Sequence, residues 1–214
     1  MKKFASIVCA ALLMVVLTYN VSADCTPIDQ PGADYTGATG KCSLGPRGST
    51  TSDCKDADGN PVVTFSSPVG VRQVGIDWAT WSSPPDAEES SPVLGFFGGT
   101  NLTLTYADLA STAGTEIENN TFEPAMPVTV SFKDSDGNEV ASVTRDVLGR
   151  SGARLFAVAC DDAVIASADI TADPGAQGFG FAQVRSDAIA FGIGPNPTGD
   201  VQPQVRENTT SNIQ

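Results

Sequence analysis

The sequence predicts an all-β protein, an antiparallel β-sandwich of jelly-roll-like type with a disulfide-stapled N-terminal loop segment. Three observations support this fold class. Short runs rich in β-branched and aromatic residues recur, Gly, Pro and Asp separate them at short intervals, and almost no stretch has helical periodicity. We therefore expect four regions, which are a signal peptide (1–23), a cysteine-containing loop segment (24–60), the β-sandwich domain (61–194) and a disordered tail (195–214).

The first region has the features of a secretory signal. Met1, Lys2 and Lys3 precede an apolar run over residues 4–17, and Val21-Ser22-Ala23 ends it with small residues around a cleavage point. This pattern predicts a secreted, extracellular protein, with an uncleaved N-terminal anchor as the alternative. The polar tail has no apolar segment, so we expect no membrane insertion after cleavage.

Charge and composition exclude several functions. The formal net charge is −13, and loss of Lys2 and Lys3 with the signal would take it to −15. Such an acidic surface repels nucleic acids and anionic membranes, so we expect no nucleic-acid partner. The sequence contains no histidine, which excludes catalytic triads and zinc sites that depend on histidine. Any catalysis would depend on carboxylates, Tyr, Lys or a metal site without histidine.

Four cysteines remain after the signal, because Cys9 lies within it. An even number in an exported chain favours disulfides, and three pairings are open. We favour Cys42–Cys54, with Cys25–Cys160 joining the N-terminal segment to the body. Binding of a metal by the four thiolates is the weaker alternative, since no Cys-x-x-Cys pair is present.

The predicted strands follow from Pro61 onward. Apolar residues alternate or cluster in short runs, and a turn-like hexapeptide divides the clearest hairpin, formed by 128–132 and 140–143. The stretch from Ala107 to Asn120 is the only one that suggests a helical turn. The other predicted strands cover residues 62–65, 69–78, 93–97, 101–106, 154–160, 163–171, 178–185 and 187–194.

Two near-identical hexapeptides, KDADGN (55–60) and KDSDGN (133–138), suggest two alternatives. Calcium loops use Asp and Asn at this spacing, so Asp56, Asp58 and Asn60 are candidate Ca²⁺ ligands. Asp and Gly also favour tight turns, and the second copy lies inside the predicted hairpin. The first copy is less well explained by a hairpin, so the calcium hypothesis concerns that copy.

The acidic loop after the first predicted strands is a candidate ligand site. Aromatic rings stack on sugars while carboxylates accept from sugar hydroxyls, which makes Trp81, Asp86, Glu88 and Glu89 candidates for glycan binding. The alternative is a solvated loop that covers a sheet edge. The acidic pairs Glu88-Glu89 and Asp161-Asp162 also permit a weaker hypothesis, carboxylate-based glycoside hydrolysis.

Three stretches together resemble a known group of domains. They are residues 62–78 (VVTFSSPVGVRQVGIDW), 128–142 (VTVSFKDSDGNEVAS) and 178–192 (GFGFAQVRSDAIAFG). They are similar to the secreted β-sandwich domains of bacterial surface and exported proteins, which often carry a C-terminal sorting anchor. The resemblance implies fold more than activity. Ala182 and Gln183 stand where those domains have an acidic pair, and we find no sorting anchor.

These observations predict a secreted binding or matrix module, with a role in adhesion. The expected partner is an extracellular glycan or a surface protein, with calcium as the only expected cofactor. Two alternatives remain open, which are a purely structural exported protein and a carboxylate-based carbohydrate-active enzyme.

Overall fold

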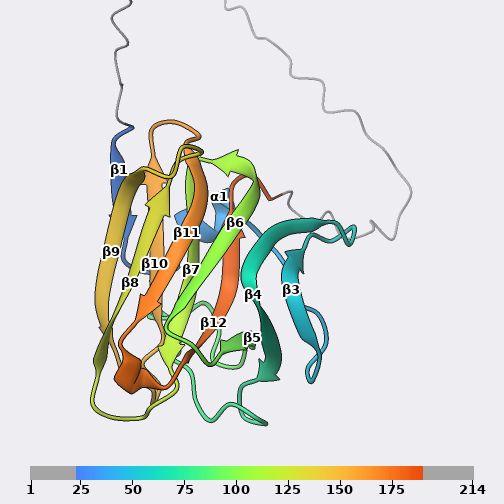
Figure 1. Cartoon of the computed structure of the whole chain (residues 1–214), viewed down its shortest axis with the longest axis vertical. Coiled ribbons are helices and arrows are strands. Elements are labelled where there is room, and N and C mark those ends of the chain that lie inside the picture. The colour runs from blue at the N-terminus through green and yellow to red at the C-terminus, as the bar shows by residue number, and fades with distance from the viewer. Residues whose placement is uncertain (1–22, 190–214) are drawn as a thin grey trace, which may run out of the picture.

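The computed structural model describes residues 23–189, so most of the predicted signal peptide and the whole tail lie outside the described residues. The all-β, antiparallel class is confirmed (Figure 1). Only short helices accompany the strands, and no helix of the described part is long and apolar enough to cross a membrane. The elements are β1 (Cys25–Ile28), α1 (Ala33–Ala38), β2 (Gly40–Lys41), β3 (Thr50–Lys55), β4 (Pro61–Gln73), β5 (Val93–Phe97), β6 (Asn101–Ala110), β7 (Thr112–Asn119), β8 (Met126–Lys133), β9 (Glu139–Val147), β10 (Arg154–Cys160), β11 (Ile165–Ala172), the 3₁₀ turn Pro174–Ala176 and β12 (Phe179–Ser186).

The strands form one hydrogen-bonded path that folds over on itself. Its order is β1-β10-β7-β12-β5-β4-β6-β11-β8-β9, with β2 beside β12 and β3 beside β4. The guanidinium of Arg145 on β9 joins the two ends of the path. It donates to the carbonyl oxygens of Leu155 on β10 (2.9 Å) and Ile28 on β1 (3.2 Å), so both edge strands gain partners.

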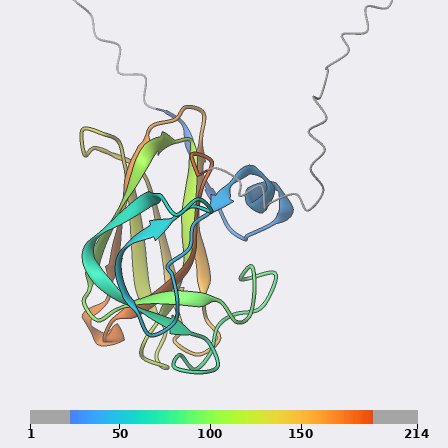
Figure 2. The same cartoon turned by 90° about the vertical axis from the view of Figure 1, so that its right-hand side faces the viewer.

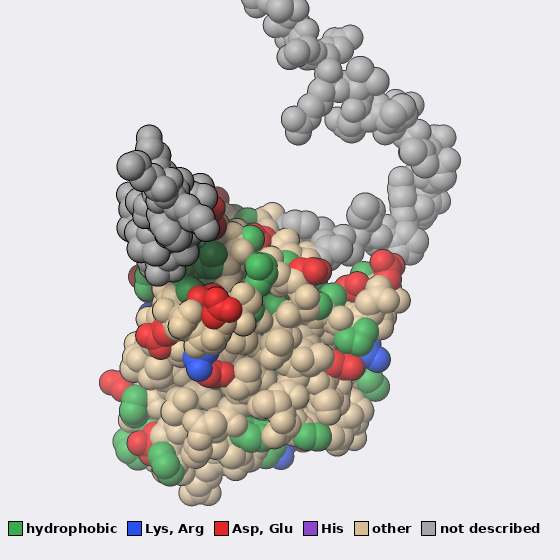
Figure 3. Space-filling model, turned by 45° about the horizontal axis from the view of Figure 1, so that its top comes forward, with side chains coloured by type: hydrophobic (Ala, Val, Ile, Leu, Met, Phe, Trp, Pro, Cys, Tyr) green, Lys and Arg blue, Asp and Glu red, His purple; other side chains and the backbone are tan. Residues whose placement is uncertain are grey.

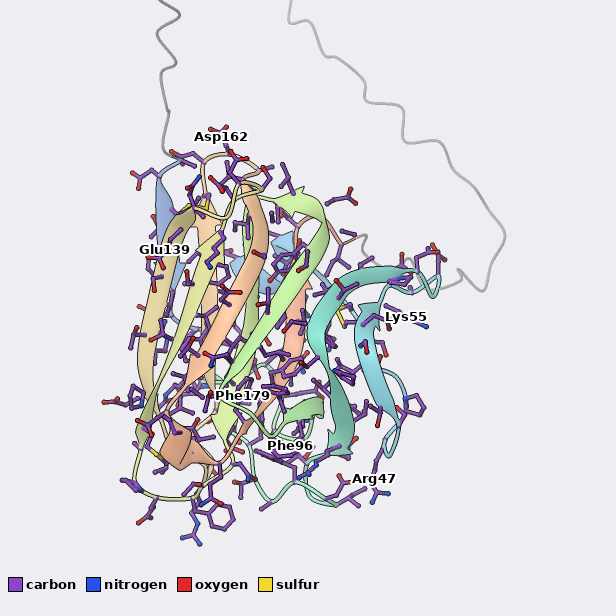
Figure 4. All side chains as sticks on the ribbon, in the orientation of Figure 1. Arg47, Lys55, Phe96, Glu139, Asp162 and Phe179 are labelled. Atoms are coloured by element: carbon purple, nitrogen blue, oxygen red, sulfur yellow. A yellow bond between two sulfur atoms is a disulfide. The ribbon has the colours of Figure 1, made fainter. Side chains whose placement is uncertain are left out.

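A single large core fills the space between the two halves of the folded sheet. Strand β8 shows how the strands contribute to this core. Every second residue of β8 is buried, and the residues between them are partly or fully exposed, so one face of the strand points into the core. Phe132, Phe156, Phe179 and Phe181 are almost completely buried, and each contributes roughly 1.5–3 kcal/mol through burial. Figure 4 labels Phe179, whose side chain is completely buried.

Both favoured disulfides are present. Cys25 and Cys160 are register partners in the β1–β10 pair, and Cys42–Cys54 joins the segment after β2 to β3. Residues 24–60 differ from the predicted loop, because they contribute β1, α1, β2 and β3 to the fold. Their apolar periodicity is weak because these strands are short and lie at the margins of the sheet.

The expected helical turn within residues 107–120 is wrong. Strand β6 continues to Ala110, and β7 follows after one residue. Strand β7 is almost entirely buried on both faces, including Glu116 and Glu118, so it lacks the alternation of apolar and polar residues that marks a half-buried strand. The predicted strand 69–78 is also too long, since β4 ends at Gln73 and a turn brings Trp78 back toward the sheet.

Candidate functional site

Residues 74–92, between β4 and β5, form a segment that we call the strap. It lies on the same side of the molecule as α1 (Figure 2) and covers the outer face of β7 and β12. Gln73 closes its base, because the side-chain amide donates to the carbonyl of Ser91 (2.6 Å). Trp78 and Trp81 point from the strap into the sheet and are 6% and 4% exposed.

Each tryptophan is bonded to a buried glutamate of β7. The indole N–H of Trp78 donates to Glu118 (2.5 Å), and that of Trp81 donates to Glu116 (2.9 Å). The backbone N–H of Glu88 donates to the second oxygen of Glu116 (2.6 Å). Glu116 and Glu118 share one face of β7 because they are two residues apart, so both carboxylates meet the strap.

Burial dominates the titration of these two glutamates. It raises the pKa of Glu116 to about 7, although the hydrogen bonds from Trp81 and Glu88 oppose the change. Burial likewise raises the pKa of Glu118 to about 7 against the bonds from Trp78 and Gly152. Neither carboxyl lines the two cavities described below, so this pair has no access to a substrate there.

The structure corrects the predicted role of Trp81. Its ring is buried against the sheet and cannot stack on a sugar, because the strap folds inward instead of standing in solvent. Asp86 pairs with Arg154 (2.8 Å) at the surface. Glycan binding by Asp86, Glu88 and Glu89 stays a prediction.

Glu88 and Glu89 lie where the strap meets β2 and β12. The guanidinium of Arg185 donates two hydrogen bonds of 2.7 Å to the Glu88 carboxylate and a third to the carbonyl of Thr39 (2.7 Å). Burial raises the pKa of Glu88, but Arg185 and Lys41 outweigh it and hold that pKa below its usual value. Lys41 lies 3.4 Å from Glu88 and 3.7 Å from Glu89.

Gln183 is the unusual residue of this cluster. It lies inside β12 with a φ of +52°, where the register against β7 shifts between Ala182 and Arg185. Its amide N–H donates to Glu89 (2.5 Å), while its carbonyl Oε1 is buried with no hydrogen-bond partner. Bulges and left-handed residues inside strands re-aim side chains, and they concentrate at functional sites.

A cavity of about 290 Å³ opens beside Gln183, and we call it the first cavity. Its volume is close to the lower end of small-molecule sites, roughly 300–1,000 Å³. Polar and apolar groups both line it, with Lys41, Glu89 and Gln183 supplying the charged and amide groups. Leu44, Val93 and Val184 supply the apolar wall.

The second cavity adjoins the first and has a volume of about 360 Å³. It lies between the loop before β3 and the turn that joins β3 to β4. Its polar lining includes Thr51, Asp53 and Lys55. Figure 4 shows Arg47 and Lys55 at the outer edge of this part of the molecule.

The two hexapeptides form the same turn. The Asp56 carboxylate accepts from the backbone N–H groups of Asp58 (3.0 Å) and Asn60 (2.8 Å) and from the Asn60 amide (3.2 Å). Asp134 makes the equivalent three bonds, at 2.9, 2.8 and 3.0 Å. The expectation that the first copy fits a hairpin poorly is wrong, because it joins β3 to β4.

Calcium binding at Asp56, Asp58 and Asn60 stays a prediction without support from the geometry. Within residues 23–189, no three Asp, Glu, Cys or His side chains are grouped closely enough to hold a metal ion. The proposed catalytic carboxylates are not brought together either. Asp161 and Asp162 lie in the turn between β10 and β11, whereas Glu88 is bonded to Arg185 of β12, and neither aspartate lines the cavity that Glu89 lines.

Sequence reasoning missed most of the residues that contact the strap or lie beside the first cavity. The missed residues are Lys41, Glu116, Glu118, Gln183 and Arg185. One signal was present in the sequence, because Gln183 and Arg185 are polar residues within an otherwise apolar strand. No comparable signal marks Lys41, which becomes important only when β2 pairs with β12.

Comparison with known proteins adds no functional information. A search of protein families found no match, and a search of curated proteins found none. Among solved structures, the enzymatically active domain of tailspike protein 4 from bacteriophage CBA120 aligns at 19% identity with a TM-score of 0.32. That alignment covers 57% of this chain and 18% of the tailspike chain, and it supports no conclusion about this protein.

Proposed function

We propose that this protein is a secreted carbohydrate-binding module and that the first cavity is its binding site. The observation that carries the proposal is that the Oε1 atom of Gln183 is buried and accepts no hydrogen bond. It belongs to a side chain that is 7% exposed, and it has no hydrogen-bond donor within the described part of the chain. A buried carbonyl without a donor costs roughly 1–3 kcal/mol, and a sugar hydroxyl would relieve that cost once the Gln183 side chain turns its carbonyl toward the cavity that the residue lines.

The other groups of the cavity suit the same ligand. The Glu89 carboxylate accepts hydrogen bonds from hydroxyl groups, and the Lys41 ammonium donates to hydroxyl oxygens. Val93 is partly exposed and lies beside these polar groups, where it can contact the C–H face of a sugar ring. The cavity therefore supports binding through hydrogen bonds and aliphatic contact instead of aromatic stacking.

Export of the chain is part of the proposal. Two disulfides persist most readily in an oxidising compartment, and the N-terminal sequence has the pattern of a secretory signal. The resemblance to secreted bacterial β-sandwich domains supports the same location. A cell-surface or extracellular glycan is then the accessible ligand.

Retention of the purified protein on insoluble cellulose, chitin, xylan, starch and β-1,3-glucan tests this proposal. Gln183→Met removes the buried carbonyl, and Gln177→Met is the control, since Gln177 is exposed and also has a positive φ (+54°). We expect at least a tenfold loss of retention for Gln183→Met and none for Gln177→Met. Absence of retention for the unmodified protein, or equal retention of both variants, would overturn the proposal in favour of a purely structural role.

A further inference from the structure

We infer that the ligand is an extended neutral polysaccharide, which crosses from the first cavity into the second. This inference rests on the proposed function, because it assigns the first cavity to one sugar unit. The two cavities share three lining residues, Ser43, Leu44 and Gly45, and we call this shared segment the ridge. The separate cavity beside α1 shares no lining residue with either, so it is not part of this surface.

The ridge is firmly held in place. Ser43 and Lys55 exchange two backbone hydrogen bonds of 2.7 and 2.9 Å, and the neighbouring Cys42 is bonded to Cys54. Within the ridge, the side chain of Leu44 is buried. A wall that is fixed before binding costs little ordering entropy when a ligand contacts it.

The ridge has no side chain at Gly45. This residue is exposed, and its φ of +91° is a conformation that glycine adopts without strain. A Cβ atom added there would approach only the Ser49 hydroxyl, at 3.9 Å. A chain of sugars can therefore cross at Gly45 without meeting a side chain of the ridge.

The second cavity repeats the chemistry of the first. Lys41 and Glu89 line the first cavity, and Lys55, Asp53 and Asp56 line the second, so each contains one ammonium group and at least one carboxylate. Paired groups of opposite sign suit hydroxyl groups, which both donate and accept. The net charge of −13 opposes a polyanion, and Figure 3 shows acidic side chains scattered over the visible face. The charges therefore favour a neutral chain.

Affinity as a function of chain length tests the inference. Titration calorimetry would use oligosaccharides of one to six units from whichever neutral polysaccharide retains the protein. We expect at least a tenfold gain in affinity between one unit and four. Polygalacturonate is the acidic probe, and we expect no binding to it.

Ala57→Trp provides the specific variant, because Ala57 is an exposed residue in the lining of the second cavity. It should keep the affinity for one sugar unit and lose the gain with length. Ala163→Trp, an exposed substitution in the turn between β10 and β11, should behave like the unmodified protein. Affinity independent of length, tighter binding of polygalacturonate, or an unchanged gain in Ala57→Trp would overturn the inference.

Failure of the proposed function would give a different result. In that case Gln183→Met would bind every chain length as the unmodified protein does. If only the second cavity is misassigned, Gln183→Met would still weaken binding of all lengths, while Ala57→Trp would have no effect.

Discussion

Two sets of carboxylates in this protein have opposite environments. Asp56 and Asp134 lie in exposed turns. Each accepts hydrogen bonds from residues two to four positions further along its own turn, and these bonds lower its pKa. Glu116 and Glu118 are fully buried and accept from the distant strap, and burial raises their pKa values to about 7. The turns stabilise only local structure, whereas the glutamates hold a separate segment against the sheet.

This difference shows what a carboxylate contributes in each setting. A turn carboxylate is already close to its donors in the unfolded chain, so its bonds cost little ordering entropy and add little stability. A buried carboxylate satisfies indole and backbone donors that would otherwise be unpaired, so its removal leaves several groups without partners. Four experiments separate the two settings, and they follow in order of expected effect.

The pH dependence of unfolding should distinguish the two sets most strongly. Glu116 and Glu118 bind their protons more tightly in the folded protein than in the unfolded chain. Their contribution to the free energy of unfolding is therefore fully present below about pH 4.5. It falls as the pH rises toward 7, by up to roughly 3 kcal/mol for each carboxyl. The turn aspartates act in the opposite sense, since their contribution is present above about pH 4 and is lost as the pH falls.

Urea unfolding from pH 3 to 8 should therefore show greatest stability at roughly pH 4–5. The double variant Glu116→Gln/Glu118→Gln cannot titrate at these positions, and its stability should change much less between pH 5 and 8. A steep fall in the double variant over that range would contradict the assignment to these two glutamates.

Removal of one buried glutamate should have the next largest effect. Glu116→Ala leaves the Trp81 indole N–H and the Glu88 backbone N–H without acceptors, which should cost roughly 2–5 kcal/mol at pH 5. Glu116→Gln keeps one acceptor, so its loss should be intermediate. Chemical denaturation measures both, and equal losses for the two variants would show that the hydrogen bonds contribute little.

Removal of a turn aspartate should have a small effect. Asp56→Ala and Asp134→Ala should each lower the midpoint of thermal unfolding by no more than about 4 °C. The two values should agree, because the two turns make the same bonds, and they should add in the double variant. A much larger loss at Asp56 alone would mean that the first turn has a role beyond closing its hairpin.

Calcium should have the smallest effect. We expect the same unfolding midpoint in calcium and in chelator, because no group of side chains in the described part is placed to hold the ion. Saturating calcium at a true site would stabilise the fold by ~2.7 kcal/mol and raise the midpoint by roughly 5–10 °C. A rise of that size would restore Asp56, Asp58 and Asn60 as ligands.

The local sequence is enough to predict much of the fold, as β8 and β9 show. Apolar residues at every second position of 128–132 specify a strand with one buried face, and KDSDGN specifies the turn that follows. The presence of two disulfides also follows from the sequence, since four cysteines lie outside the predicted signal and an even number favours pairing, although the count alone leaves three pairings open. These features depend on neighbouring residues or on simple counting.

The candidate site could be predicted only in part. Glu88 and Glu89 stand out as an acidic pair, but their partners Lys41, Gln183 and Arg185 lie far away in the sequence. The burial of Trp81 could not be predicted, because it depends on how the strap folds onto β7.

By itself, the sequence determined the antiparallel β class, the hairpin turn at 133–138 and the absence of histidine chemistry. Only the tertiary structure decided that β7 is a strand, that Glu116 and Glu118 are buried, and that two cavities meet at Gly45. The physical reason is the range of the interactions. Strand alternation and turns are set by residues a few positions apart, whereas burial, pKa and cavity shape depend on segments that only folding brings together.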